Sequence, residues 1–217
     1  MTPKQERAVR TRTRLVLSAA EAFDRQGFAV ASLTAISNSA GVSNGALHFH
    51  FESKEALAAA VEAEAAERVR AIVEGAARKG ASALQALVDT SHAIMLRLRE
   101  DVVVRAGFRL SGDAARQAAH GLPEQWRQSV ARLLEQAGRD GSLSSAVAPS
   151  DVAGVVTATV LGFGVLARFD SAWLASGSLS GFWKLMLPLI AAGPVERGEL
   201  DCEPAAPPGA SRATAVR

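Results

Sequence analysis

The chain has 217 residues, of which 48% are hydrophobic and 21% are charged. These proportions are typical of a soluble globular protein and exclude a chain that lacks a hydrophobic core. The net charge is only +2, but residues 1–54 carry seven lysines and arginines against four acidic residues. A basic N-terminal quarter favours contact with a polyanion, although chance clustering gives the same charge.

The single cysteine, Cys202, lies in a Pro/Ala-rich tail, which excludes an intramolecular disulfide and a multi-cysteine metal site. One cysteine fits a reducing cytosol, and the N-terminus lacks the apolar region of a signal peptide. We therefore expect a cytoplasmic protein. Residues 152–167 are strongly apolar, but these 16 residues are fewer than the ~20 that a membrane span needs. We interpret them as a buried core or interface helix and expect no membrane partner.

Helical periodicity dominates the chain, and no sustained period-two alternation predicts a strand. Gly27 is placed to end the first helix, and the run from Thr2 to Gln5 resembles a helix start, so this helix begins early or follows a short arm. The first helix has one apolar face, formed by Leu15, Val16, Ala19, Ala20 and Phe23.

Two short helices are predicted next, over residues 33–40 and 44–50, with Ser32 and Ser43 as their N-caps. A long helix follows residue 53 and ends at a glycine near residue 75 or 80. Further helices are predicted over residues 82–100, 102–110, 123–139, 151–168 and 180–192.

Two features mark the C-terminal end. Pro188 should kink or shorten the last predicted helix, because proline removes a backbone donor. The segment from Gly193 has no apolar periodicity and is expected to be disordered.

The segment from residue 36 to residue 47 has the features of a helix-turn-helix. Gly41 tolerates the left-handed backbone that the turn requires, and Ser37 is small enough for the two helices to cross closely. Apolar residues occupy the inner positions: Ile36, Ala40, Val42 and Leu47. Two ordinary short core helices give the same spacing, so both interpretations stand at this point.

The run GVSNGALHFHFESKEALAAAV, residues 41–61, resembles the signature of the TetR family of repressors, and residues 11–40 resemble the family's first two helices. The resemblance covers about residues 8–60. It implies an all-α protein with an N-terminal three-helix helix-turn-helix DNA-binding head over residues 1–53. A C-terminal helical ligand-binding and dimerisation body would follow over residues 54–192, and the tail would occupy residues 193–217.

Farther along, residues 102–111 and 122–134 resemble the γ-butyrolactone autoregulator-receptor subfamily, which controls antibiotic production in actinobacteria. Members of that subfamily carry a tryptophan at the place of Trp126, on the wall of the ligand pocket. Basic members are often pseudo-receptors that respond to antibiotics or biosynthetic intermediates. The pI of about 9.1 favours that type.

The third helix of such a head enters the major groove of DNA with its N-terminal residues at the base edges. Asn44 can pair with adenine through two hydrogen bonds, and Gly45 lets the backbone approach the DNA. The expected DNA-binding residues are Ser43, Asn44, Gly45 and Ala46 at the bases, with Ser32, Thr34, His48, His50 and Lys54 at phosphates.

The sequence departs from the family pattern at two of these positions. His48 replaces the usual tyrosine, and Asn44 stands where the autoregulator receptors often have lysine, so an operator sequence cannot be transferred from relatives. Histidine titrates near neutrality, which makes phosphate affinity sensitive to pH. A metal site at His48 and His50 is disfavoured, because residues two apart on a helix point to different faces. We expect no metal and no cofactor.

In the body, the expected ligand-binding residues are Trp126, Phe108, Val130, Thr159 and Phe163, although core packing is an alternative role for each of them. Thr159 would give an apolar pocket the polar group that orients a ligand. Arg105 and Arg109 either contact an acidic or carbonyl ligand or brace the head through salt bridges.

The apolar segment 152–167 contains small residues four apart, at Gly154, Ala158 and Gly162. Small residues on one line let helices approach closely, which favours a two-fold interface. The other candidates for this interface are Phe182, Trp183, Leu185 and Leu189. A core helix of the monomer is the alternative interpretation.

The sequence therefore predicts a ligand-responsive transcriptional repressor that binds double-stranded operator DNA as a homodimer. A small-molecule effector, namely a γ-butyrolactone-type signal, an antibiotic or a biosynthetic intermediate, would release it and so control secondary metabolism. The alternatives are a drug-efflux repressor with a broad pocket and a repressor without small-molecule input. No enzyme activity is expected, because the sequence has no Gly-rich phosphate loop, nucleophile elbow, zinc spacing or convincing acid–base pair.

Overall fold

The computed structural model describes residues 2–77, 82–113, 116 and 121–193. Within these residues the secondary structure is helical, apart from one isolated bridge between Leu143 and Ala191, which confirms the predicted all-α class. The helices are α1 (Pro3–Gln26), α2 (Leu33–Ser39), α3 (Asn44–His50), α4 (Lys54–Ala77), α5 (Ala83–Glu100), α6 (Val102–Ser111), α7 (Leu122–Arg139), α8 (Pro149–Leu166), the 3-10 helix η1 (Ser171–Leu174) and α9 (Ser176–Ile190). Most of the predicted tail, with Cys202, lies outside the described residues.

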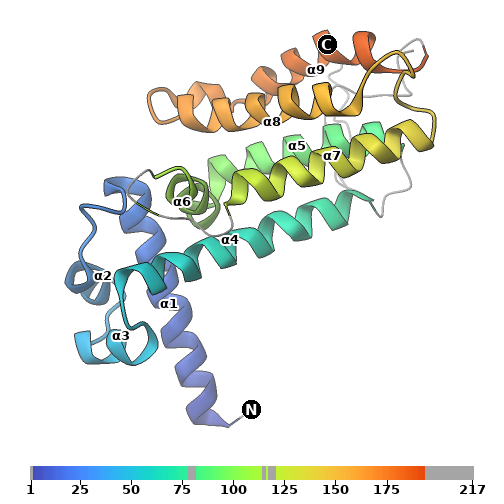
Figure 1. Ribbon diagram of the computed structural model, residues 1–217. Helices are drawn as coiled ribbons and strands as arrows, with labels where there is room; N and C mark the ends of the chain where they lie inside the picture. The colour runs from blue at the N-terminus through green and yellow to red at the C-terminus, as the bar shows by residue number, and fades with distance from the viewer. Residues whose placement is uncertain (1, 78–81, 114–115, 117–120, 194–217) are drawn as a thin grey trace, which may run out of the picture.

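Figure 1 shows α1, α2 and α3 at one end of the molecule and the remaining helices extending away from them. We call these two parts the head and the body. The long α4 leaves the head and runs along the body, and α8 and α9 lie on the opposite side from α4 (Figure 1). The predicted helical head and helical body are therefore both present.

The centre of the body is α5, against which α4, α6, α7, α8, α9 and η1 all pack. Thirteen of its residues are buried, and several of them are polar. A buried polar group needs a hydrogen-bond partner to offset its desolvation. One such partner is Trp183 on α9, whose indole Nε1 donates to the Ser91 hydroxyl at 2.9 Å.

Side-chain caps explain where several helices begin. Thr2 and Gln5 form a reciprocal capping box, so α1 takes the early start that the sequence offered as one of two possibilities. The hydroxyl of Ser43 accepts a hydrogen bond from the Ala46 amide at 3.1 Å, and this fixes the start of α3. Ser32 occupies the N-cap position of α2, but its side chain makes no capping hydrogen bond.

Asp101 joins three helices, because it follows the last residue of α5, caps α6 and pairs with a residue of α4. Its carboxylate accepts from the Val103 and Val104 amides and binds Arg68, with an Nη1–Oδ2 distance of 2.7 Å. Burial raises the pKa of Asp101, but the hydrogen bonds and charge of Arg68 outweigh it and hold the pKa below its ordinary value. The carboxylate therefore stays ionised at the joint between α5 and α6.

A glycine permits the close packing of α6 on α4. A Cβ added to Gly107 would lie 2.5 Å from the Cβ of Ala65 and 2.6 Å from Cδ1 of Leu122, both below any normal contact distance. A larger residue at position 107 would therefore push α6 away from α4. Since α6 also packs against α1, the position of α6 on α4 influences where the head lies.

The predicted boundaries are least accurate near the C-terminus. The last helix begins at Ser176, four residues before the prediction, and η1 precedes it without having been predicted. Packing of Leu174 and Leu179 into the core favours helical turns in this segment, despite its serines and glycines. Pro188 lies inside α9, which ends two residues later at Ile190.

Candidate DNA interface and ligand-binding site

The turn between α2 and α3 has the left-handed backbone that the sequence predicts. Gly41 has a φ angle of +63°, and the Val42 amide donates to the Ser37 carbonyl at 3.0 Å. Arg14 of α1 braces this turn, because its guanidinium donates to the carbonyl oxygens of Ala40 and Gly41. The angle between the two short helices is thus fixed by a glycine and by an arginine that the sequence analysis did not single out.

The N-terminal end of α3 is open to solvent. Ser43, Asn44 and Gly45 are exposed, Ala46 is half-buried, and Leu47 anchors the helix with a fully buried side chain. The Asn44 amide makes no side-chain hydrogen bond to any of the described residues. Its donor and acceptor are therefore available to a base edge in the major groove.

Four of the five expected phosphate ligands also lie near the surface of the head. Ser32 and Thr34 are exposed at the start of α2, and His48 is exposed on α3. His50 is half-buried and lies edge-on to the Phe49 ring, with the ring centroids 5.3 Å apart. Among the described residues, no group of three or more His, Cys, Asp or Glu is arranged to hold a metal.

Lys54, the fifth, is engaged within the head. Its ammonium donates to the carbonyl oxygens of Ala29 and Ala31, both at 3.1 Å, and lies 4.7 Å from the centroid of the Phe28 ring. These contacts tie the loop before α2 to the start of α4. Lys54 therefore has a structural role in the head whether or not it also approaches a phosphate.

Phe49 is a candidate DNA contact that the sequence analysis missed. Its side chain is 83% exposed on α3, which is unusual for an aromatic ring of this size. Phe49 lies two residues after the buried Leu47, and two residues are about 200° on a helix, so it projects from the opposite face. That spacing was available in the sequence. An apolar ring there can contact the methyl group of a thymine.

In the body, Trp126 and Val130 lie one turn apart on the fully buried face of α7. The indole Nε1 of Trp126 is buried and has no hydrogen-bond partner among the described residues, and the same holds for the hydroxyl of Thr157 on α8. Leaving such a group unpaired costs about 1–3 kcal/mol. Because α7 and α8 pack together, a polar group held between them would relieve that cost.

The other three expected ligand residues, Phe108, Thr159 and Phe163, do not form one cluster with Trp126 and Val130. Thr159 and Phe163 are half-buried on α8, and Phe163 stacks on Trp173, with ring centroids 5.9 Å apart. Phe108 lines a separate cleft at the junction of head and body. Thr157, two residues before the expected Thr159 and therefore on nearly the opposite face of α8, is the threonine whose polar atom is buried and unpaired.

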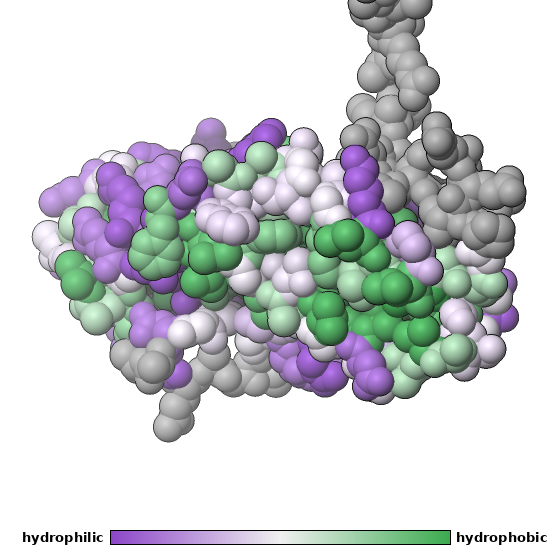
Figure 2. Space-filling model, turned by 90° about the horizontal axis from the view of Figure 1, so that it is seen from above, coloured by the Kyte–Doolittle hydropathy of each residue, from purple (hydrophilic) through white to green (hydrophobic). Residues whose placement is uncertain are grey.

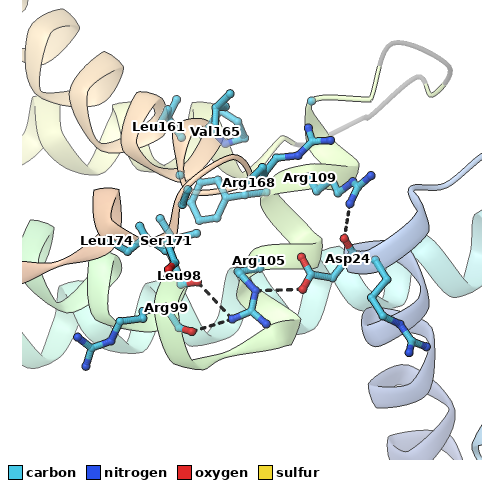
Figure 3. Close-up of a pocket in the computed structure, with 16 residues that line it drawn as sticks. Asp24, Leu98, Arg99, Arg105, Arg109, Leu161, Val165, Arg168, Ser171 and Leu174 are labelled. Atoms are coloured by element: carbon cyan, nitrogen blue, oxygen red, sulfur yellow. Dashed lines mark hydrogen bonds and ion pairs between the residues drawn. The ribbon is translucent and has the colours of Figure 1, made fainter.

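Two arginines of α6 brace the head. Arg105 donates to the carboxylate of Asp24 on α1, with an Nε–Oδ2 distance of 3.0 Å. Arg109 donates to the main-chain carbonyl of Asp24 (Figure 3). Of the two roles that the sequence left open for Arg105 and Arg109, the structure shows bracing. These bonds connect the end of α1 to the body.

Comparison with known proteins agrees with this architecture. Residues 15–61 match the model of the bacterial regulatory proteins of the tetR family. The A-factor receptor protein of Streptomyces griseus is 34% identical over 189 residues, which are 87% of this chain and 66% of that protein.

The chain belongs to the TetR family.

Its structure is also similar to those of γ-butyrolactone receptors, which confirms the predicted family. One of them, an ArpA-like protein, has a TM-score of 0.76 and 27% identity over 87% of this chain and 91% of the other. CprB from Streptomyces coelicolor, in complex with its biological operator sequence, has a TM-score of 0.72 and 28% identity over 85% of this chain and 90% of the other.

Substitutions at two glycines of this TetR-family head, Gly41 and Gly45, test protein stability and DNA binding separately. Gly41→Ala should destabilise the protein by about 1–2 kcal/mol, because alanine is strained at positive φ and its Cβ would lie 2.7 Å from Nη2 of Arg14. Gly45→Ala should be neutral or stabilising by about 0.5–1 kcal/mol, because Gly45 is helical with open space around it. Urea unfolding measures both effects.

Gly45→Ala should nevertheless weaken DNA binding in a mobility-shift assay, since the added methyl group holds the backbone away from the base edges. Unchanged DNA affinity in Gly45→Ala, or equal stability of the two variants, would contradict these assignments.

Proposed function

We propose that this protein is a transcriptional repressor that binds operator DNA as a homodimer and is released by a small molecule. The observation that carries the proposal is the N-terminal end of α3. It is exposed, its Asn44 side chain is unpaired within the described residues, and a braced left-handed turn holds it in place. A rigid, open helix end of this kind is suited to base readout. The likeness to CprB bound to its operator supports the same role.

The effector proposed for the body is a mostly apolar molecule that carries a hydrogen-bond acceptor. The buried indole Nε1 of Trp126 can donate but not accept, so a carbonyl oxygen is its natural complement. The surroundings on α7 are apolar, and they include the fully buried Val130. A γ-butyrolactone-type signal has this chemistry, and so do many antibiotics and biosynthetic intermediates. Such an effector would place the protein in the control of secondary metabolism.

The proposed dimer interface is the outer face of α8 and α9. Figure 2 shows hydrophobic residues gathered on this side of the molecule. Leu185 is 75% exposed and Leu189 is 70% exposed, while Gly154 and Gly162 have open space around them. A second copy of the chain related by a two-fold axis would cover this face.

The exposed apolar face of α8 could also be interpreted as a membrane-spanning surface. Among the described helices, α8 alone is long and apolar enough to cross a membrane by length and composition, with a mean hydropathy of 1.5, and only 28% of it is buried. We attribute its exposed apolar surface to the proposed dimer interface. This fits the packing of its other face on α7 and α5.

In the proposed mechanism, the dimer has two arrangements that differ in the distance between its two α3 helices. Only a spacing of about 34 Å, one turn of DNA, places both helices in successive major grooves. An effector that prefers the other arrangement lowers the affinity for DNA, and DNA lowers the affinity for the effector by the same factor.

The proposal is tested with a mobility shift on the DNA upstream of the protein's own gene, with and without an extract of the host culture. We expect a specific shift that Asn44→Ala weakens, with loss of about 1–3 kcal/mol of discrimination at one base pair, and that the extract reverses. A shift that saturating extract leaves intact favours a repressor without small-molecule input. No specific shift on this DNA and none in genome-wide selection would contradict the role of the head.

The dimer is tested separately by analytical ultracentrifugation. Leu185→Glu with Leu189→Glu should convert the dimer to a monomer, because each change places a charge in an apolar interface. Val30→Glu, at a side chain of the head that is also 70% exposed, is the matched control and should remain dimeric. A wild-type protein that sediments as a monomer, or a double variant that stays dimeric, would contradict this interface.

A further inference from the structure

A cleft of about 740 Å³ opens between the head and the body (Figure 3). It is separate from the buried Trp126. Its walls come from the end of α1, the end of α5, three residues of α6, the start of α7, the end of α8 and η1. Both Trp126 and Val130 are absent from its lining. The cleft is therefore a second candidate binding site, and its walls belong to both parts of the protein.

The cleft carries an excess of positive charge. One carboxylate, Asp24, lines it together with five arginines: Arg25, Arg99, Arg105, Arg109 and Arg168. Asp24 neutralises Arg105, and Arg99 pairs with Glu100 at 2.8 Å. Arg109 donates to a main-chain carbonyl, which satisfies a hydrogen bond without neutralising its charge.

The remaining two, Arg25 on α1 and Arg168 after α8, make no side-chain hydrogen bond or ion pair with the described residues. Both are exposed. They line the cleft from different parts of the molecule, since Arg25 belongs to α1 of the head and Arg168 follows α8 of the body. Neither guanidinium group is paired with a carboxylate of the described chain, so each of them is open to an anion.

Apart from the exposed Ser171, the rest of the lining is apolar. Leu98 and Leu174 are buried, Leu161 and Phe108 are half-buried, and Val165 is 56% exposed. An inorganic ion would leave this apolar wall in contact with water. A ligand with a hydrocarbon or aromatic body would cover it and gain about 25 cal/mol for each Å² of apolar surface removed from water.

We propose that this cleft binds a small organic anion, with an acidic group bound by one of its unpaired arginines, Arg25 or Arg168, and an apolar body against Leu161 and Val165. Guanidinium groups bind carboxylate and phosphate oxygens through paired N–H donors, which fits either acidic group. Because its charges are exposed, the site is screened by salt, and its affinity should fall as ionic strength rises.

Occupancy of the cleft would also bear on the head, a consequence that rests on the proposed function. The anion would lie beside the bond between Arg105 and Asp24, which holds α1 to α6. An acidic group that draws Arg105 away from Asp24 removes one brace of the head. By linkage, an anion that prefers one head position alters operator affinity, and operator DNA alters anion affinity equally.

The binding site itself is tested by calorimetry on the full chain without DNA, so its outcome does not depend on the proposed function. The probes are octanoate, 1-octanol and inorganic phosphate. Octanoate should bind more tightly than either of the other two, because it alone combines an acidic group with an apolar body. The double variant Arg25→Gln with Arg168→Gln should weaken octanoate binding about tenfold or more, the equivalent of ~1.4 kcal/mol.

The matched control is Arg10→Gln with Arg139→Gln, which removes the same two charges from exposed arginines that lie outside the cleft. It should bind octanoate like the wild type. The proposal is overturned if octanoate gives no binding in the millimolar range, if 1-octanol binds equally well, or if Arg25→Gln with Arg168→Gln keeps wild-type affinity. If phosphate binds as tightly as octanoate, the proposal that the apolar wall contributes to binding is overturned.

Discussion

The arrangement of head and body depends on the contact between α6 and α4 at Gly107 and Ala65. Here two helices approach so closely that a single added methyl group would overlap its neighbour. That approach puts α6 where it also packs on α1, and it puts Arg105 and Arg109 within reach of Asp24. A helix that touches the head on one side and the body on the other is suited to transmit a change between them, because packed interfaces shift between discrete arrangements rather than deform continuously.

The two fully buried tryptophans of the body differ in one respect. Trp183 donates its indole hydrogen to Ser91, whereas Trp126 has no partner among the described residues. Both rings fill the core equally well, so packing does not explain the difference. Since buried donors are nearly always paired, the unpaired indole hydrogen of Trp126 is the observation that supports the proposed effector site.

The sequence predicted those features that depend on neighbours along the chain. The left-handed turn at Gly41, the Ser43 cap and the bounds of α3 all follow from residues within a few positions of one another. The family signature extended this to the helical body. Contacts between distant residues were not predictable: Arg14 reaches the turn from α1, and Lys54 bonds carbonyl groups more than twenty positions earlier.

The same limit applies to the binding sites. A choice between Thr157 and Thr159 depends on how α8 is rotated against α7, which periodicity alone does not specify when a helix is apolar nearly all round. The two roles left open for Arg105 and Arg109 could be separated only when Asp24 was found beside them. The cationic cleft combines residues from six elements, so no local sequence pattern predicts it.

We expect the close packing of α6 on α4 to set the position of the head. The most direct measurement compares operator affinity, by fluorescence anisotropy, for Gly107→Ala and for Gly138→Ala, a helical glycine of α7 with open space around it. Circular dichroism confirms that both variants are folded, and stoichiometric titration fixes the active fraction. Gly107→Ala should lose operator affinity, whereas Gly138→Ala should keep it. Wild-type affinity in a folded Gly107→Ala variant would contradict the claim.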